Sequence, residues 1–106
     1  MIEICNLRNE MMFHEYDICV DRRSALGNPF YMHCELERDE VCDKYEAWFK
    51  KQLEEKTNYK FIKAIEALEE IYDYYGKLRL FCWCYPKRCH AETIKKYLEG
   101  ELKWKN

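Results

Sequence analysis

Apolar residues recur at the three- and four-residue spacing of a helix along two consecutive stretches in the middle of the chain. The first covers residues 39–55, and the second runs from a cap at Thr57 or Asn58 to Tyr75. The first apolar face consists of Val41, Cys42, Tyr45, Trp48, Phe49 and Leu53. The second consists of Phe61, Ile62, Ile65, Leu68, Ile71, Tyr72 and Tyr75. We therefore predict two amphipathic helices in succession, the second ended by Gly76 in a left-handed conformation.

Period-two alternation predicts strands in three other places. Residues 2–7 and 16–20 alternate in the way of short strands. The third strand follows Gly76 and has two faces, with Leu78, Leu80, Cys82 and Cys84 on one and Arg79, Phe81 and Trp83 on the other. Both faces are mostly apolar, which is typical of a strand covered on both sides. We expect Pro86 to end this strand, because proline cannot donate to a strand ladder.

A third helix is expected to begin between Cys89 and Ala91. The order of elements is then β-β-α-α-β-α, and the helical crossover before the last strand favours parallel pairing. We predict a single α/β domain over residues 1–106, with a small, mostly parallel, Rossmann-like three-stranded sheet and about three helices. Parallel strands end at one edge, so we expect the loop at 21–30 and the turn at 84–92 to face one crevice. In the tail, Trp104 could return to the domain.

Composition narrows the class of protein. The formal net charge of −2 lacks the basic excess of a general nucleic-acid binder, and no apolar run is long enough to span a bilayer. The first residues also lack the apolar core of a signal peptide. Seven cysteines are an odd number, and in such a chain we expect reduced thiols rather than a disulfide framework. These features predict a cytoplasmic globular domain without a membrane partner.

The predicted loop at 21–30 carries groups that suit an anion. Arg22, Arg23 and Ser24 follow directly after a strand, and arginine binds phosphate or carboxylate through two parallel hydrogen bonds. The remaining candidate ligand contacts are Asn28, Phe30 and Trp83. The tryptophan lies near the end of the third strand, where its ring could stack on a flat ligand. The competing interpretation of the two arginines is a solvated charge pair.

The candidate catalytic residues are Cys89, His90 and Glu92. They lie where a helix begins after a strand, and the free N–H groups and helix dipole at such a place favour anions and lower the pKa of a thiol. His90 would act as acid or base with Glu92 orienting it, and Cys89 would be the nucleophile. In the competing interpretation, Cys89 packs under the turn and His90 caps the helix. The sequence leaves open whether the site catalyses a reaction or only binds.

Cys82, Cys84, Cys89 and His90 form the pattern C-x-C-x4-C-H, and thiolates and imidazole are zinc ligands. Structural zinc sites favour two or more residues between paired cysteines, and the neighbours Cys89 and His90 would both have to turn inward. We therefore predict no metal ligands and no cofactor, with a structural zinc site as the alternative. The simplest interpretation of Cys82 and Cys84 is small apolar residues on a buried strand face.

Four features of the chain occur together in one known family. They are Arg23-Ser24, the run Gly27-Asn28-Pro29-Phe30, the helical pair Tyr45 and Trp48, and the run CWCYPKRCHAE from Cys82 to Glu92. With them the chain resembles the domain-of-unknown-function family 4326, a family of small bacterial and bacteriophage proteins. The resemblance implies a compact Rossmann-like fold and a phage or prophage origin, and it implies no particular reaction. Phe81 and Ala91 replace smaller residues of the family pattern, and we expect them to narrow the crevice.

The first functional hypothesis is a small phage-related protein that binds or processes a nucleotide-like or phosphorylated small molecule. Its site would be the edge formed by residues 21–30 and 84–92. The alternative is a phage interaction protein that blocks a host defence protein through exposed aromatic and acidic side chains on its helices. A zinc-stabilised structural domain is the third hypothesis, and metal removal would unfold such a domain.

Overall fold

The computed structural model describes residues 1–101 of the 106-residue chain. Its elements are β1 (Ile2–Asn6), β2 (Asp17–Cys19), the 3-10 helix η1 (Glu35–Glu37), α1 (Arg38–Glu55), α2 (Tyr59–Tyr75), β3 (Leu78–Cys82) and α3 (Ala91–Leu98). The predicted order β-β-α-α-β-α is confirmed, with η1 as an addition that the sequence pattern did not indicate. The expectation for Trp104 lies outside the described residues.

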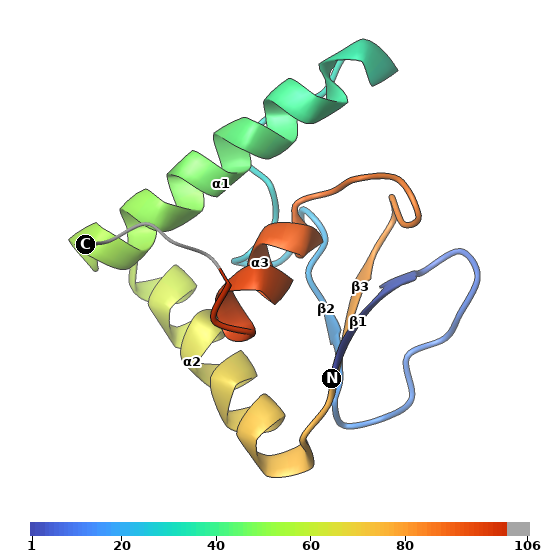
Figure 1. The fold of residues 1–106 in the computed structure, drawn as a ribbon, viewed down its shortest axis with the longest axis vertical. Coiled ribbons are helices and arrows are strands. Elements are labelled where there is room, and N and C mark those ends of the chain that lie inside the picture. The colour runs from blue at the N-terminus through green and yellow to red at the C-terminus, as the bar shows by residue number, and fades with distance from the viewer. Residues whose placement is uncertain (102–106) are drawn as a thin grey trace.

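The three strands form one parallel sheet in the order β1-β3-β2. The last strand in the sequence lies in the centre, where Leu80 pairs with Ile4 on one side and with Ile18 on the other. Because both pairings are parallel, the strands end at the same edge of the sheet, as Figure 1 shows. The loops that follow β2 and β3 therefore leave the sheet together, as the sequence predicted.

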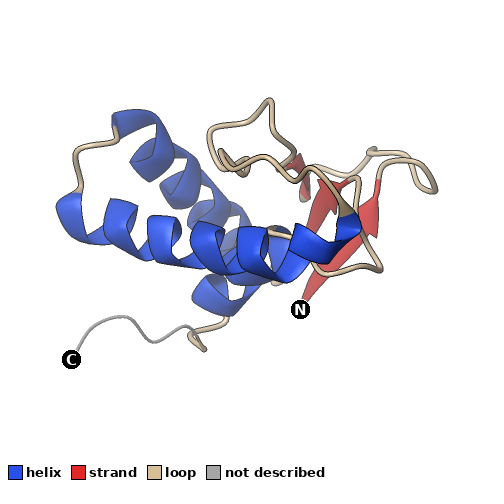
Figure 2. Cartoon of the chain, turned by 90° about the horizontal axis from the view of Figure 1, so that it is seen from above, coloured by secondary structure: helices blue, strands red, loops and turns tan. Residues whose placement is uncertain are grey.

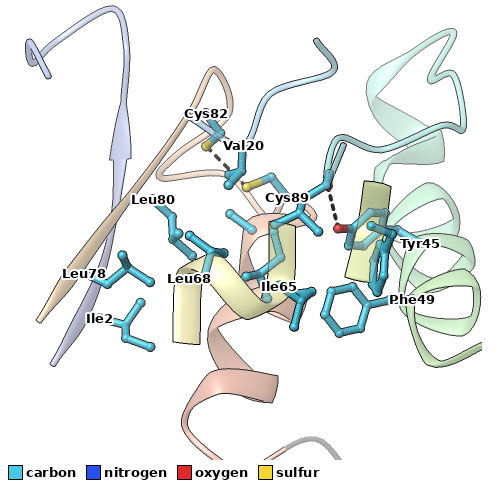
Figure 3. Close-up of a cluster of buried hydrophobic side chains, with 14 residues drawn as sticks. Ile2, Val20, Tyr45, Phe49, Ile65, Leu68, Leu78, Leu80, Cys82 and Cys89 are labelled. Atoms are coloured by element: carbon cyan, nitrogen blue, oxygen red, sulfur yellow. Dashed lines mark hydrogen bonds between the residues drawn. The ribbon is translucent and has the colours of Figure 1, made fainter. Parts of the chain in front are cut away.

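The α-helices of the described chain pack on one side of the sheet (Figures 1 and 2). Between them and the sheet lies the core, which Figure 3 shows as a continuous cluster of buried side chains. Its sheet side consists of Ile2, Val20, Leu78, Leu80 and Cys82, and its helix side includes Tyr45, Phe49, Phe61, Ile65, Leu68 and Ile94. The amphipathic faces predicted for the two long helices thus meet the apolar face of the central strand.

The connection between β1 and β2, rather than a helix, covers the other face of the sheet (Figure 1). Arg79 on the central strand donates a hydrogen bond of 3.0 Å to Glu10, and its Nε lies 3.2 Å from Asp17 Oδ1. The guanidinium also lies 5.9 Å from the ring centroid of Phe13 and 5.1 Å from that of Phe81. These contacts hold the connection over the sheet, and Phe81 beneath it is fully buried. The prediction that β3 is covered on both faces is therefore confirmed.

Local chemistry sets the ends of α2. The Asn58 side chain accepts a hydrogen bond of 3.2 Å from the Phe61 N–H, which makes Asn58 rather than Thr57 the cap. At the other end Gly76 follows Tyr75 with a φ of 70° and ends the helix in the left-handed conformation.

The central strand ends earlier than the sequence predicted. β3 stops at Cys82, and the backbone beyond it is held by a side chain of β1. The Asn6 amide donates to the carbonyl oxygens of Trp83 and Tyr85, at 3.3 Å and 2.8 Å. These bonds draw the chain out of the strand after Cys82, before the turn that contains Pro86. Cys84 consequently lies beyond the strand and is only half-buried against the edge of the core, so its predicted place on a buried strand face is wrong.

Candidate functional site

A small crevice lies between the loop after β2 and the turn after β3, and we call it the carboxyl-edge crevice. It is lined by Arg22, Asn28, Met32, Arg38, Val41, Cys42, Cys84, Cys89 and His90, with a volume of about 50 Å³. A water molecule takes about 30 Å³ in the liquid, so this space suits one small group such as a phosphate or a carboxylate. A whole drug-sized ligand needs roughly 300 Å³ or more. Most of any larger ligand would therefore lie outside the crevice.

Asp21, which the sequence did not single out, organises the loop after β2. Its buried carboxylate accepts hydrogen bonds from the Arg23 N–H at 3.0 Å, from Arg23 Nη2 at 2.6 Å and from Trp83 Nε1 at 3.1 Å. These partners, Arg23 first, hold the pKa of the Asp21 carboxyl well below its usual range despite the opposing effect of burial. A carboxylate directly after the predicted strand end and beside two arginines is the signal that could have revealed it.

The same loop turns back tightly on itself. A Cβ on Gly27 would lie 2.4 Å from the Asp21 carbonyl oxygen, so only glycine fits there. Tyr45 on α1 donates a hydrogen bond of 2.6 Å to the Leu26 carbonyl oxygen (Figure 3). The loop is thus fixed against both the sheet edge and α1, and this positions Arg22 and Asn28 at the crevice.

The structure separates the residues predicted to bind a ligand. Arg22 and Asn28 line the crevice, and Arg22 donates to the Asn28 carbonyl oxygen. Arg23 instead extends outward, with 77 % of its side chain exposed, and pairs with Asp21. Like Arg23, the other three predicted ligand contacts do not line the crevice: Ser24, Phe30 and Trp83. Of these, Trp83 is tied to Asp21 through its indole N–H and keeps 49 % of its surface exposed.

His90 bridges the two loops from a buried position. Its Nε2 contacts the carbonyl oxygen of Val20, and its ring lies edge-on to Tyr45 at 5.1 Å. A carbonyl can only accept, so Nε2 carries the hydrogen and Nδ1 is the acceptor. Burial lowers the pKa of His90, which is therefore neutral near pH 7. The sequence suggested Glu92 as the residue that orients His90. The structure instead places the Val20 carbonyl oxygen in that role.

The sequence predicted free backbone N–H groups at the start of α3, but two of these groups are already paired in the structure. The Glu92 N–H donates to the Cys89 carbonyl oxygen at 3.1 Å, and the Thr93 N–H donates to the His90 carbonyl oxygen at 3.0 Å. Glu92 also lies outside the set of residues that line the crevice. An anion in the crevice would therefore depend on side chains rather than on the helix terminus.

Three thiols meet beneath the crevice. Cys82 and Cys89 are buried with their sulfur atoms 3.4 Å apart, and Cys84 is half-buried at the crevice wall (Figure 3 shows the first two). Hydrogen bonds with Cys82 and Cys84 raise the pKa of the Cys89 thiol far above its usual range. A hydrogen bond with Cys89 lowers the pKa of Cys84, and the charge of Arg38 acts in the same direction. These contacts and burial thus favour the protonated form of Cys89.

Arg38 is the second functional residue that sequence reasoning missed. It opens α1 and lines the crevice with only 15 % of its side chain exposed. Its guanidinium pairs with Glu35 at 2.7 Å and donates to the Arg88 carbonyl oxygen at 2.8 Å. A cation in the first turn of a helix opposes the helix dipole, and this mismatch is the signal that could have marked the residue.

The four residues of the predicted zinc alternative do not form a metal-binding arrangement, because His90 does not direct its Nε2 at the three thiols. Nε2 of His90 is directed at the Val20 carbonyl, while Cys82 and Cys89 contact each other. Within residues 1–101, no group of three or more His, Cys, Asp or Glu side chains has an arrangement that would hold a metal ion. Nor does any helix in this part of the chain have the length and apolarity needed to cross a membrane.

Two departures from the family pattern have no contact with the crevice. Phe81 packs beneath Arg79 on the far face of the sheet, and Ala91 is fully buried in the core under the helices. Neither side chain lines the crevice, so the expectation that they would narrow it is wrong.

Comparison with known proteins identifies the family of the chain. No curated protein and no solved structure matches the chain. The model of the domain of unknown function DUF4326 matches residues 5–100, which include both crevice loops and the central strand. This range covers nearly the whole chain, in agreement with the motifs seen in the sequence. The chain therefore belongs to the DUF4326 family.

Proposed function

We propose that this protein binds or processes a phosphorylated, nucleotide-like small molecule at the carboxyl-edge crevice. The observation that carries the proposal is the presence of two guanidinium groups, Arg22 and Arg38, on a space of about 50 Å³. Guanidinium is the side-chain group that best matches phosphate and carboxylate oxygens. The crevice would hold the anionic group alone, and the rest of the ligand would lie over the exposed surface around it.

Of the arginines near the crevice, Arg22 is the best candidate to receive an anion. Arg23 is neutralised by Asp21 and Arg38 is paired with Glu35. Arg22 forms no ion pair within the described residues, and its known contacts are the Asn28 carbonyl oxygen and the Tyr31 ring, 5.3 Å from its guanidinium. An anion would therefore displace only a neutral partner of Arg22. Tyr31, which is 77 % exposed, would offer a flat face for a base beside it.

The remaining chemistry of the site suits either binding or proton transfer. His90 is a neutral imidazole whose Nδ1 can accept a proton, and it lines the crevice. The neutral state near pH 7 is the state that a general base requires. We propose a cytoplasmic, phage-related setting, since all seven cysteines are free thiols and the family pattern includes bacteriophage proteins.

A larger hollow on another part of the surface is less suited to an anion than the carboxyl-edge crevice. It has a volume of about 480 Å³ between α1, α2 and α3, and it is lined by three carboxylates, those of Glu54, Glu66 and Glu69, and by one amine, that of Lys56. The net negative charge of this lining disfavours phosphate. The smaller crevice, with its arginines, is the place where an anionic ligand is stabilised.

The test is a titration of the protein with inorganic phosphate, pyrophosphate and a panel of nucleotides. Binding is measured by calorimetry and by changes in NMR chemical shifts. Arg22→Gln and Arg8→Gln form a matched pair, because Arg22 lines the crevice and Arg8 is exposed in the connection between β1 and β2. Loss of one charge-assisted contact is worth about 1.5–3 kcal/mol, so we expect at least tenfold weaker binding by Arg22→Gln and a change within twofold by Arg8→Gln. Equal effects of both substitutions, or no binding of any anion, would refute the proposal.

A further inference from the structure

The turn after β3 holds Cys84 at the wall of the crevice in a fixed position. The Cys84 carbonyl oxygen accepts a hydrogen bond of 2.8 Å from the Lys87 N–H, which closes the turn on one side. On the other side, Asn6 anchors the carbonyl oxygen of Tyr85 at 2.8 Å. A side chain mounted on a backbone tied at both ends is pre-organised, as a reacting group needs to be.

The neighbouring thiols make Cys84 the member of the group that carries negative charge. Interacting thiols titrate together, so one thiolate makes a second one costly. Cys82 lies in the core, where a charge is poorly solvated, whereas Cys84 is half-buried and faces the crevice. Cys89 is buried as well, whereas Arg38 lines the same crevice as Cys84 and lowers the pKa of that thiol. Of the three thiols, Cys84 is therefore the one placed to carry a negative charge.

We propose that Cys84 is the nucleophile of the crevice, acting on a small carbon electrophile whose phosphate or carboxylate group is held by Arg22 and Arg38. This rests on the proposed anion site and adds a reaction and a substrate class to it. It also moves the nucleophile from Cys89, which is buried at 3 % exposure, to the thiol that the crevice exposes. The three groups line the same small space, so an anion at the arginines places its neighbouring carbon beside the sulfur.

The step is a displacement at carbon. The Cys84 thiolate donates its electron pair to the electrophilic carbon and forms a C–S bond. The bond from that carbon to its leaving group breaks, and the leaving group departs with the bonding pair. No proton moves in the step, because Cys84 is already a thiolate and Cys89 keeps its own proton.

The probe pair is iodoacetate and iodoacetamide, which have the same electrophilic carbon and leaving group and differ in the carboxylate. Alkylation is followed residue by residue with peptide mass spectrometry, and Cys34, an exposed thiol before η1, is the internal control. Charge-lined clefts raise the local concentration of an opposite ion by about 10–10³-fold. We expect the iodoacetate-to-iodoacetamide rate ratio at Cys84 to exceed that at Cys34 at least tenfold, and to fall as salt is added.

Variants assign the effect to the crevice. Arg22→Gln should reduce the ratio at Cys84 by severalfold and leave Cys34 unchanged, while Arg8→Gln, at an exposed arginine outside the crevice, should change neither. Inorganic phosphate should slow alkylation of Cys84 and not that of Cys34. Arg38→Gln should also reduce the ratio at Cys84, and if this variant fails to fold, Arg38→Lys, which keeps the charge without the paired geometry, replaces it. The inference is overturned if Cys84 reacts no faster than Cys34, or if it shows no preference for the anionic reagent.

Phosphate binding by Cys84→Ser separates this inference from the proposed function. Binding that persists in Cys84→Ser, together with an unreactive Cys84 in the native protein, overturns the nucleophile and leaves the anion site standing. If the native protein binds no phosphate or nucleotide, the proposed function fails and the nucleophile inference, which rests on it, fails with it.

Discussion

At the scale of single residues, the crevice depends on side chains that link its two loops. His90 joins the turn after β3 to the end of β2 through the Val20 carbonyl, and Trp83 joins the same two segments through Asp21. Both links are buried or half-buried. Each is made by a ring N–H group, which can donate a hydrogen bond but cannot accept one. A carbonyl or carboxylate partner is thus required at each, and the loops are held in one arrangement.

The state of His90 predicts a pH dependence of stability. Burial lowers its pKa in the folded protein, so between that value and about 6.5 only the unfolded chain takes the proton, and stability falls as the pH drops through this window. We expect the loss to approach 1.4 kcal/mol per pH unit, an order-of-magnitude slope of about one proton. Urea unfolding from pH 7.5 to 5.5 measures it.

The control for this prediction is the exposed His33. His90→Gln should be less stable at pH 7.5 but should lose the slope, whereas His33→Gln should keep both the stability and the slope of the native protein. If native protein and His90→Gln show the same slope, the histidine is not held neutral by the fold.

At the scale of elements, local sequence signals were sufficient to predict the two long helices. The apolar spacing predicted α1 and α2 within one residue of their observed bounds, Arg38–Glu55 and Tyr59–Tyr75. The ambiguous point was the cap of α2, because Thr57 and Asn58 both have suitable oxygen atoms. The structure assigns it to Asn58, whose side chain accepts from the Phe61 N–H at 3.2 Å.

This cap gives a prediction at the same scale. Asn58→Ala should reduce the free energy of unfolding by about 1 kcal/mol, because it removes a partner of an otherwise unsatisfied N–H of α2. Thr57→Ala should stay within about 0.5 kcal/mol of the native protein, as expected for an exposed substitution without such a bond. Chemical denaturation of both variants measures the difference. A larger loss in Thr57→Ala than in Asn58→Ala would contradict the assigned cap.

At the scale of the whole molecule, the fold is assembled by contacts between distant parts of the chain. The last strand in sequence, β3, occupies the centre of the sheet, and the N-terminal amine donates a 2.9 Å hydrogen bond to the Gly76 carbonyl oxygen just before it. At the carboxyl edge, contact between the thiols of Cys82 and Cys89 joins β3 to the start of α3. We expect the stability of this edge to rest on this contact and on the hydrogen bonds of His90 and Trp83.

This arrangement predicts that chelation leaves the fold intact. Since His90 faces Val20 and two of the three thiols contact each other, we expect the melting temperature to be unchanged by excess EDTA. Thermal unfolding with and without EDTA, and the zinc content of the same purified sample, are the measurements. One zinc per chain, together with a melting temperature that falls in EDTA and returns on adding zinc, would instead establish the zinc-stabilised domain.

The sequence by itself determined the type and order of the elements and the edge at which the site lies. Apolar spacing is a local property, and Asn58 and Gly76 act within a few residues of their own position. The parallel arrangement, and with it the convergence of the loops after β2 and β3, followed from the helices between the strands.

Only the tertiary structure decided which side chains meet at that edge. Asn6 lies 79 residues before Tyr85 and His90 lies 70 residues after Val20, so no local pattern connects the members of either pair. The early end of β3 and the placement of Cys84 at the crevice both follow from such distant contacts. Their energies depend on burial and geometry that exist only once the chain has folded, whereas periodicity is present in every short stretch.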